Sequence, residues 1–360
     1  MSILTKASLA FLQKYLNNAS PTGFEAEGQK LWLEYIKPFI DDWDIDNYGS
    51  AYGIVNTKEK FRVVIEGHAD EIGWYVGFIS DDGFLSVFKN GGSDHIIAPA
   101  KRVNIHTKNN GVIKGVFGWP AIHIRRGDKA NLSPTPENIF VDVGAKDKDE
   151  VLKMGITIGT VITFDDEFMS LNERWLVGRA LDNRLGGFIV AEVLRLLKQN
   201  KKKLPFALYA VNAVQEEVGL RGAEMIADTI KPHCAIITDV THDTYTPLLT
   251  PKHLGDVKCG KGPSLTVAPA VHNKLLNLII DAANENNIPY QMEASSRFTG
   301  TDTDAFAYSN GGVPSALISI PLRYMHTTVE MACKEDVENV IKLIYQSLLK
   351  IEKNHNFKYF

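Results

Sequence analysis

An apolar run at residues 206–214 ends in two adjacent glutamates, Glu216 and Glu217, and a helical pattern begins at Leu220. The run has the composition of a buried strand, so the chain must place two carboxylates side by side at the end of a core element. Like charges repel each other, and burial penalises both ionised forms. Taken alone, the pair is more typical of a solvated turn, where acidic residues favour the start of a helix. The rest of the chain instead favours a cation or a transferred proton beside them.

Strands and helices alternate on both sides of residues 72–168. Short apolar runs predict strands at 62–66, 206–214, 235–239 and 315–320. Helical patterns cover 4–18, 185–198, 221–230, 274–286 and 335–351. A capping-box sequence from Thr22 to Glu25 predicts a further helix that ends near Ile40. This alternation predicts an α/β fold in which helices flank a mostly parallel sheet.

The segment from Ile72 to about Phe168 has a different pattern. Short β-like runs alternate there with turn signals such as Asp82-Gly83. Because the α/β pattern resumes only after this segment, we expect a discontinuous domain of residues 1–70 and 168–360, with a β-rich domain of residues 71–167 inserted into it. Trp74 and Trp119 are predicted to be exposed aromatic residues of the inserted domain.

Composition argues against several classes of protein. A net charge of -4 gives no reason to expect nucleic acid as a partner. No window approaches the ~20 apolar residues of a membrane span. Lys6, Gln13 and Lys14 interrupt the first apolar stretch, so no signal-peptide core is expected. Three cysteines without a CxxC pair indicate a protein without disulfides, and a cytoplasmic enzyme fits these properties.

Residues that bind metals or protons stand after each predicted core strand and, in one case, just before a helix. In chain order they are His68, Asp70, Asp182, Glu216, Glu217, Asp239 and His326. Open α/β sheets bind their ligands at the carboxyl ends of the strands. Imidazole and carboxylate are the ligands expected for zinc, cobalt or manganese. Five candidate ligands exceed what one catalytic zinc uses, and they suit a two-metal site with a bridging carboxylate.

Each of these residues also has an ordinary structural explanation. Asp182 fits a helix N-cap, and Asp239 could open a turn with Thr241 and Asp243. Their common position at one sheet edge favours a site instead. A glycosidase with paired carboxylates is an alternative, although it gives the histidines no role. A non-catalytic peptide-binding protein is another. A phosphate-binding loop is rejected, because Gly262 stands where Ser or Thr is required.

Six segments resemble, in order and over nearly the whole chain, the TET-type dinuclear metallo-aminopeptidase family. This family includes glutamyl, leucyl and deblocking aminopeptidases, and some members are described as endoglucanases. The segments are Gly67–Gly73, Ala180–Arg184, Gln215–Ala223, Asp239–Thr241, Gly260–Pro263 and Arg323–His326. The resemblance implies a metal-dependent aminopeptidase that removes the N-terminal residue from short peptides. It also implies an inserted, barrel-like dimerisation domain and a homo-oligomer built from dimers, of which a dodecamer is one form.

The resemblance assigns a role to each site residue. Two divalent metal ions per subunit, zinc or cobalt with manganese as a further option, would be held by His68, Asp182 and Asp239 and by Asp182, Glu217 and His326. Asp182 would bridge the ions. Glu216 would be the general base, and Asp70 would orient His68. Because neighbouring side chains on an extended backbone point apart, the two glutamates could take separate roles.

Departures from the family pattern are small. Ala69 stands where a larger apolar residue is expected, and Thr327-Thr328 replaces a common Ser-Pro. The segment 301–305 aligns with the family's Thr-Asp-Ala in two ways, so Asp302 and Asp304 stay outside the predicted site, although either could shape the substrate pocket.

Overall fold

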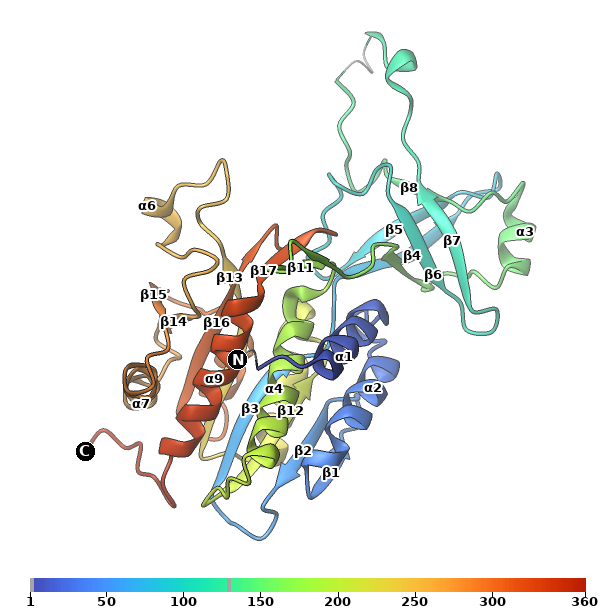
Figure 1. Ribbon diagram of the computed structural model, residues 1–360. Coiled ribbons are helices and arrows are strands. Elements are labelled where there is room, and N and C mark those ends of the chain that lie inside the picture. The colour runs from blue at the N-terminus through green and yellow to red at the C-terminus, as the bar shows by residue number, and fades with distance from the viewer. Residues whose placement is uncertain (1–2, 128–130) are drawn as a thin grey trace.

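The computed structural model describes residues 3–127 and 131–360, which form a large mixed sheet flanked by helices and a smaller closed barrel (Figure 1). Nine strands of the sheet follow one another in the order β1 (Asp42–Ile45), β2 (Ala51–Val55), β12 (Ala207–Ala213), β3 (Arg62–His68), β13 (Cys234–His242), β16 (Ser315–Arg323), β17 (Glu330–Cys333), β11 (Trp175–Gly178) and β10 (Met169–Leu171). Beside this path, β14 (Ser264–Val267) pairs with β16, and β15 (Gln291–Ala294) pairs with β14.

The parallel part of the sheet is its centre. β3 pairs in parallel with β12 and β13, and β13 pairs in parallel with β16. The strands outside these four on the main path are antiparallel to their neighbours. Parallel strands are covered on both faces, which explains why β3 contains the fully buried run Val63, Val64 and Ile65. Alternating strands and helices therefore predict the parallel centre, and the antiparallel strands on either side of it make the sheet mixed.

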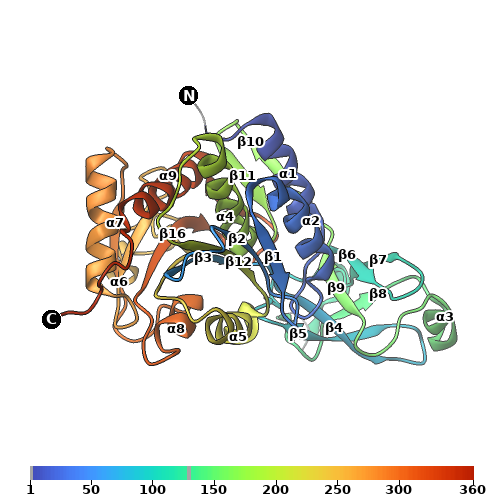
Figure 2. The same cartoon turned by 90° about the horizontal axis from the view of Figure 1, so that it is seen from below.

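Helices cover both faces of the sheet (Figure 2). One face carries α1 (Lys6–Asn17), α2 (Ala26–Ile36), α4 (Leu181–Gln199) and α9 (Lys334–Lys350), and the other carries α5 (Arg221–Ile230) and α8 (Asp302–Ala307). α7 (Asn273–Glu285) packs against α9, and the short α6 (Pro251–Leu254) lies in the segment between β13 and β14. α4 crosses β3, β12 and β13 and is buried along most of its length. None of the helices in the described part of the chain is long and apolar enough to cross a membrane.

A closed barrel interrupts the chain between β3 and β10. Its strands follow the order β4 (Gly73–Ile79), β5 (Leu85–Asn90), β8 (Phe140–Asp142), β7 (Val112–Phe117), β6 (Arg102–His106) and β9 (Val161–Phe164). α3 (Lys148–Lys153) lies between β8 and β9 in the chain, and the side chain of Asp147 caps its first turn. The barrel has a hydrophobic core separate from that of the sheet. Closure of the barrel leaves no free sheet edge in this part of the molecule.

Trp74 is not exposed, contrary to the prediction. Its ring is fully buried in the barrel core, where it packs edge-on against Phe117 and Phe164. The strand register shifts between Val76 and Phe78, so that Phe78, two residues further on, faces solvent instead of the core. Without this irregularity, alternating residues of β4 would all face the same side. Trp119, by contrast, is half-buried against the barrel core.

The predicted capping box does not form. The hydroxyl of Thr22 donates to Asp70 instead of capping a helix, and Glu25 is the N-cap of α2. Oε1 of Glu25 accepts hydrogen bonds from the backbone N–H groups of Gly23 and Gln215. α2 also ends before Ile40, since the chain continues from Lys37 as the 3-10 helix η1 (Lys37–Phe39), which contains a proline. The hydroxyl of Thr22 thus binds the segment after β3 instead of the helix that its local sequence pattern predicts.

Candidate metal centre

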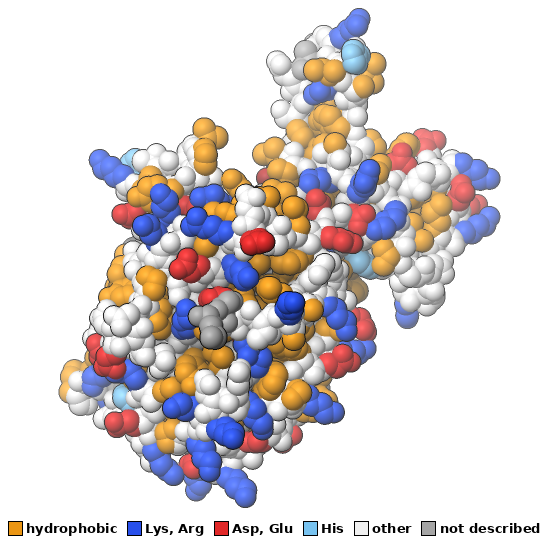
Figure 3. Space-filling model, viewed as in Figure 1, with side chains coloured by type: hydrophobic (Ala, Val, Ile, Leu, Met, Phe, Trp, Pro, Cys, Tyr) orange, Lys and Arg blue, Asp and Glu red, His pale blue; other side chains and the backbone are white. Residues whose placement is uncertain are grey.

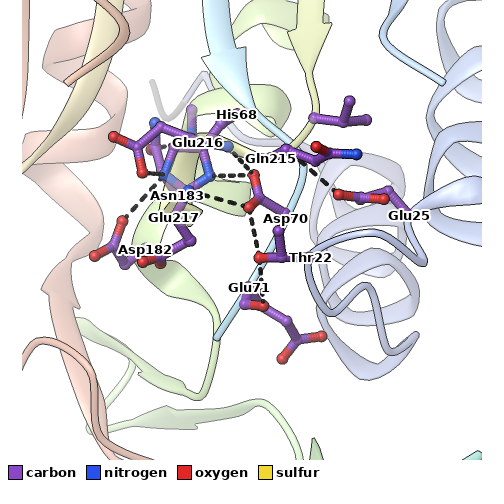
Figure 4. A network of polar contacts seen from close by, with 12 residues as sticks. Thr22, Glu25, His68, Asp70, Glu71, Asp182, Asn183, Gln215, Glu216 and Glu217 are labelled. Atoms are coloured by element: carbon purple, nitrogen blue, oxygen red, sulfur yellow. Dashed lines mark hydrogen bonds and ion pairs between the residues drawn. The ribbon is translucent and has the colours of Figure 1, made fainter. Parts of the chain in front are cut away.

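The central strands bring four of the predicted site residues to one edge of the sheet, and Figure 4 shows three of them, His68, Glu216 and Glu217. His68 is the last residue of β3. Asp239 lies within β13, which continues to His242 instead of ending at Asp239 as predicted. β12 leads into the 3-10 turn η4 (Glu216–Val218), which carries both glutamates. The parallel register aligns the ends of β3 and β12, since Ala213 stands opposite His68.

Asp182 and His326 reach the same edge from less regular backbone. Asp182 lies in the first turn of α4, with φ and ψ of -79° and 112°, which are not helical. It is not the N-cap that its sequence position suggested, because Ala180 occupies that position. His326 follows β16 and has a φ of +60°, which only a few non-glycine residues adopt. Both side chains point toward the strand ends and complete the cluster.

His68, Asp182 and Asp239 form one group of potential metal ligands. One ligand atom from each residue lies within 4.8 Å of the others, and all three residues are buried. Nε2 of His68 is 3.4 Å from Oδ1 of Asp182 and 3.9 Å from Oδ1 of Asp239. These separations leave room for an ion that each atom could contact directly.

Asp182, Glu217 and His326 form a second group. Nε2 of His326 is 3.2 Å from Oδ2 of Asp182 and 3.4 Å from Oε2 of Glu217. Asp182 therefore directs one carboxylate oxygen to each group. A carboxylate shared in this way is the arrangement that bridges two neighbouring ions.

Glu216 lies beside the first group. Its Oε2 is 3.8 Å from Nε2 of His68, and His68, Glu216 and Glu217 also satisfy the criterion for a metal-binding group. Geometry alone thus allows Glu216 either to contact an ion or to stand next to one. The sequence resemblance favours the second role.

Asp70 contacts both His68 and the turn that carries the two glutamates (Figure 4). Its carboxylate lies 3.2 Å from Nδ1 of His68, the ring nitrogen that faces away from the other ligands. It also accepts hydrogen bonds from the backbone N–H groups of Glu216 and Glu217, at 3.0 and 3.2 Å, and from the hydroxyl of Thr22 at 2.8 Å. One buried carboxylate therefore fixes the histidine and the turn that carries both glutamates.

The pKa shifts of the clustered groups show that so many buried carboxylates are energetically unfavourable unless positive charge accompanies them. Burial, together with the charges of Asp239 and other carboxylates, raises the pKa of Glu216 to about 10 despite the opposing effect of His68. Burial likewise raises the pKa of Asp239 to about 7. Burial alone would lower the pKa of His326, but its bonds to Asp182 and Glu217 raise it to about 11. These shifts reflect the negative charge gathered in the pocket, which a divalent cation would offset.

The donor set fits divalent metal ions. Two imidazoles and several carboxylates are the ligands that zinc, cobalt and manganese accept. Oε1 of Glu217 is buried without a hydrogen-bond partner, as expected of an oxygen that binds a cation. The buried imidazole and carboxylate groups of this chain are therefore suitable ligands for divalent metal ions.

A cavity of about 470 Å³ opens directly onto the cluster. Its remaining wall is formed by Val240, Thr241, His242, Thr299, Gly300, Thr301 and Met325. A larger cavity of about 830 Å³ lies between residues 17–27 and the barrel, and none of the six clustered histidines and carboxylates lines it. The smaller cavity is therefore the one in which a bound molecule would meet the site.

Glu330 contacts two of the clustered residues and was not predicted. Its Oε1 accepts the backbone N–H of His326 at 2.8 Å, and its Oε2 accepts that of Asp182 at 3.1 Å. It begins β17, a short strand between β16 and β11 that has no clear sequence signal. A carboxylate four residues after the matched segment at 323–326, beside the apolar run Met331–Cys333, was the available hint.

The two aspartates that were left outside the site occupy different places. Asp302 is buried beside Glu66, and burial raises the pKa of both carboxyl groups. Asp304 instead accepts the backbone N–H groups of Thr299 and Gly300, at 2.9 and 3.1 Å. Asp304 therefore holds the loop that lines the cavity, whereas Asp302 lies behind it.

An α/β sheet that gathers imidazole and carboxylate donors at its carboxyl edge has the architecture of a metal-dependent hydrolase. Residues 49–343 match the M42 glutamyl aminopeptidase family, and the chain belongs to this family of peptide-bond hydrolases. The lysyl aminopeptidase of Pyrococcus furiosus is 33% identical over 336 residues, which cover 92% of this chain and 94% of that protein.

Solved structures agree with this assignment. A TET aminopeptidase from a marine sediment archaeon of the Thaumarchaeota superposes with a TM-score of 0.90 and 29% identity, over 95% of this chain and 96% of that one. The TET1 peptidase of Pyrococcus horikoshii, which can assemble into a tetrahedron or a large octahedral shell, superposes with a TM-score of 0.82 and 28% identity, over 94% and 98% of the two chains. The whole architecture is shared, including the inserted barrel.

Proposed function

We propose that this chain is a dinuclear metallo-aminopeptidase, in which His68, Asp182 and Asp239 hold one ion and Asp182, Glu217 and His326 hold the other. The observation that carries the proposal is the pair of ligand groups that share Asp182. When bound, two divalent ions would polarise the peptide carbonyl and lower the pKa of a water molecule shared between them. Zinc and cobalt suit the imidazole and carboxylate donors best, and manganese is a further option.

Glu216 acts as the general base in this proposal. Its carboxylate lies beside the first ligand group, where it can accept the proton of the attacking water and pass it to the leaving amine. Burial keeps the pKa of Glu216 high while the site holds protons, and positive charge beside it lowers that pKa toward the working range. Asp70 holds the Nδ1 side of His68 and both glutamate N–H groups, so it orients the ligands without touching the substrate.

The cavity favours action at a peptide end. The clustered carboxylates provide negative charge for a free α-amino group inside the cavity of about 470 Å³. Short peptides that bring their N-terminus into this space are the substrates. Assembly into a homo-oligomer built from dimers would restrict access further, and the shells formed by the TET1 peptidase support this arrangement. The proposal includes a cytoplasmic location, which agrees with the free, buried thiols of Cys234, Cys259 and Cys333.

A glycosidase would use the carboxylates differently. It needs two carboxyl groups about 5 Å or more apart on opposite sides of a sugar. Glu216 and Glu217 are neighbours on one turn and share the same wall of the cavity, and the histidines would have no function in such a reaction. The site therefore supports peptide hydrolysis better.

Removal of metal tests the function directly. We expect the purified chain to release a chromophore from aminoacyl substrates, to lose this activity after treatment with a chelator, and to regain it with zinc, cobalt or manganese. Substrates with an acetylated N-terminus serve as matched controls and should remain uncleaved. Activity that survives complete metal removal, or hydrolysis of cellulose derivatives in place of peptides, would contradict the proposal.

A further inference from the structure

The turn that follows β5 in the barrel lies against two of the proposed ligands. A Cβ atom on Gly92 would lie 2.4 Å from Nδ1 and 2.6 Å from Cε1 of His326. One on Gly91, whose φ is +71°, would lie 3.1 Å from Cβ of Glu217. Real Cβ atoms essentially never approach within 3.0 Å, so His326 can keep its place only beside a glycine. We propose that the Gly91-Gly92 turn is a positioning element of the metal centre, which sets the affinity of the second ligand group for its ion.

The imidazole of His326 is held between this turn and the carboxylates. Its Nε2 faces Asp182 and Glu217, while the edge formed by Nδ1 and Cε1 faces Gly92. The backbone N–H of His326 donates to Glu330, which fixes the backbone position from which the imidazole extends. Gly92 therefore limits how the ring can turn and keeps Nε2 directed at the second ion position.

The turn is itself anchored to the rest of the site. The hydroxyl of Ser93 donates to the carbonyl of Gly73 at 2.6 Å, which ties the turn to the start of β4. The side-chain amide of Asn90 donates to the carbonyl of Thr22 at 2.9 Å, and the hydroxyl of Thr22 donates to Asp70. Hydrogen bonds thus connect the barrel through Thr22 to Asp70 at the sheet edge. The Gly91-Gly92 turn of the inserted domain therefore borders the metal centre.

Substitution of Gly92 by alanine should separate the two ion positions. The φ of Gly92 lies outside the left-handed region, so the cost of alanine is the contact with His326 and not the backbone. The side chain of His326 is 32% exposed and can swing toward solvent, so the fold should survive while the ligand is displaced. Since the loss of a group that orients a metal ligand typically costs about 10–100-fold in metal affinity, we expect this loss at the second position alone.

Gly77→Ala in the same barrel is the matched control. Its Cβ would meet the ring of Phe88 at 2.7 Å, again with a φ outside the left-handed region, but Phe88 is exposed and can move away. Chelator-stripped full-length proteins would be titrated calorimetrically with zinc and with cobalt, and their thermal melting compared. Wild type and Gly77→Ala should bind two ions alike, whereas Gly92→Ala should keep one ion and bind the other at least tenfold more weakly.

This inference rests on the proposed two-ion function, and the titration distinguishes the failure of each. Wild type that binds a single ion would overturn the two-ion proposal. Two unchanged ions in folded Gly92→Ala, beside a two-ion wild type, would overturn the positioning role alone. If Gly92→Ala does not fold, Ser93→Ala removes the anchor of the turn without adding atoms. Folded Ser93→Ala should also weaken the second ion, and an unchanged titration of that variant would overturn the inference.

Discussion

Glu216 and Glu217 leave the chain in different directions although they are neighbours. They lie on a 3-10 turn and not on the extended backbone that the sequence suggested, and successive side chains of such a turn diverge by about a third of a rotation. Glu217 thereby approaches His326, and Glu216 approaches His68. The two backbone N–H groups are held by a single carboxylate, that of Asp70. This divergence allows one glutamate to bind an ion while the other transfers a proton.

Replacing each glutamate by glutamine should separate these roles. Glu217→Gln should lower the occupancy of one ion, and added metal should restore part of the activity, because a ligand is weakened and the base remains. Glu216→Gln should retain both ions and bind peptides normally, while kcat falls by roughly 10²–10⁴-fold, as expected for the loss of a general base. Elemental analysis of metal content beside kcat measures both effects.

The opposite pattern would reverse the assignment. If Glu216→Gln lost an ion and Glu217→Gln kept both, Glu216 would be the ligand, which the distances also permit. Each glutamine variant is the charge control for the other, because both remove one carboxylate from the same turn.

Glu25 makes stability depend on pH. Burial and the neighbouring Asp70 raise its pKa from the ordinary 4.5 to about 7, although it accepts hydrogen bonds from Gly23 and Gln215. Between these values the folded protein holds a proton that the unfolded chain releases, so the stability contributed at low pH is lost as pH rises through about 7. Glu25→Gln keeps a hydrogen-bond acceptor without the charge. Its melting temperature, relative to wild type, should therefore be higher at pH 8 than at pH 5.

Metal-free samples of both proteins at both pH values make this comparison. Parallel pH profiles of the two melting temperatures would show that Glu25 does not bind the expected proton. A relative gain for Glu25→Gln at pH 5 instead of pH 8 would give the opposite sign and contradict the raised pKa.

At the scale of strands and helices, the site was predictable wherever a local pattern ends in a functional residue. β3 and β12 are apolar runs, and His68 and Glu216 follow directly from where these runs end. Thr22 and Gly92 act through contacts between distant parts of the chain, which leave no local pattern, and the only local hint for Glu330 is its position beside an apolar run. The register shift in β4, which places Trp74 inside and Phe78 outside, also depends on the neighbouring strand. Alternation predicted the parallel centre of the sheet but not its antiparallel edges.

Glu330, at the start of the short strand β17, links two parts of the site. Its carboxylate joins the start of α4 to the loop after β16, because each oxygen accepts one backbone N–H. Glu330→Gln replaces one of these oxygens with a donor and leaves a buried N–H unsatisfied. We expect unfolding free energy to fall by about 1–3 kcal/mol and ion affinity to fall as Asp182 or His326 shifts. Urea unfolding and metal titration measure the two effects.

Glu285→Gln provides the comparison, since it removes an exposed carboxylate that pairs with Lys350 on the surface. Such surface pairs contribute little to stability, so this variant should unfold and bind metal as wild type does. Equal behaviour of Glu330→Gln and Glu285→Gln would show that the junction at Glu330 does not support the site.

At the scale of the whole molecule, the barrel presents apolar side chains to solvent. Phe78 and Phe88 on β4 and β5 are 58% and 66% exposed. Hydrophobic side chains also gather on the segment that projects from the barrel between β7 and β8, where Ile122 and Ile124 are exposed (Figure 3). Exposed apolar groups of this kind favour association, and the proposed dimers would cover them.

Charge on this surface should therefore disrupt assembly. We expect the double variant Phe78→Asp, Phe88→Asp to shift the protein to smaller species in light scattering at micromolar concentration, because a carboxylate in an apolar interface is costly to desolvate. The barrel fold should persist, since both side chains point away from its core. Trp43→Asp, on edge strand β1 of the large sheet, changes an exposed aromatic residue outside the barrel and should leave the assembly intact. A stable wild-type monomer would remove the idea of assembly, and dissociation by Trp43→Asp but not by the barrel variant would place the contact on the large sheet instead.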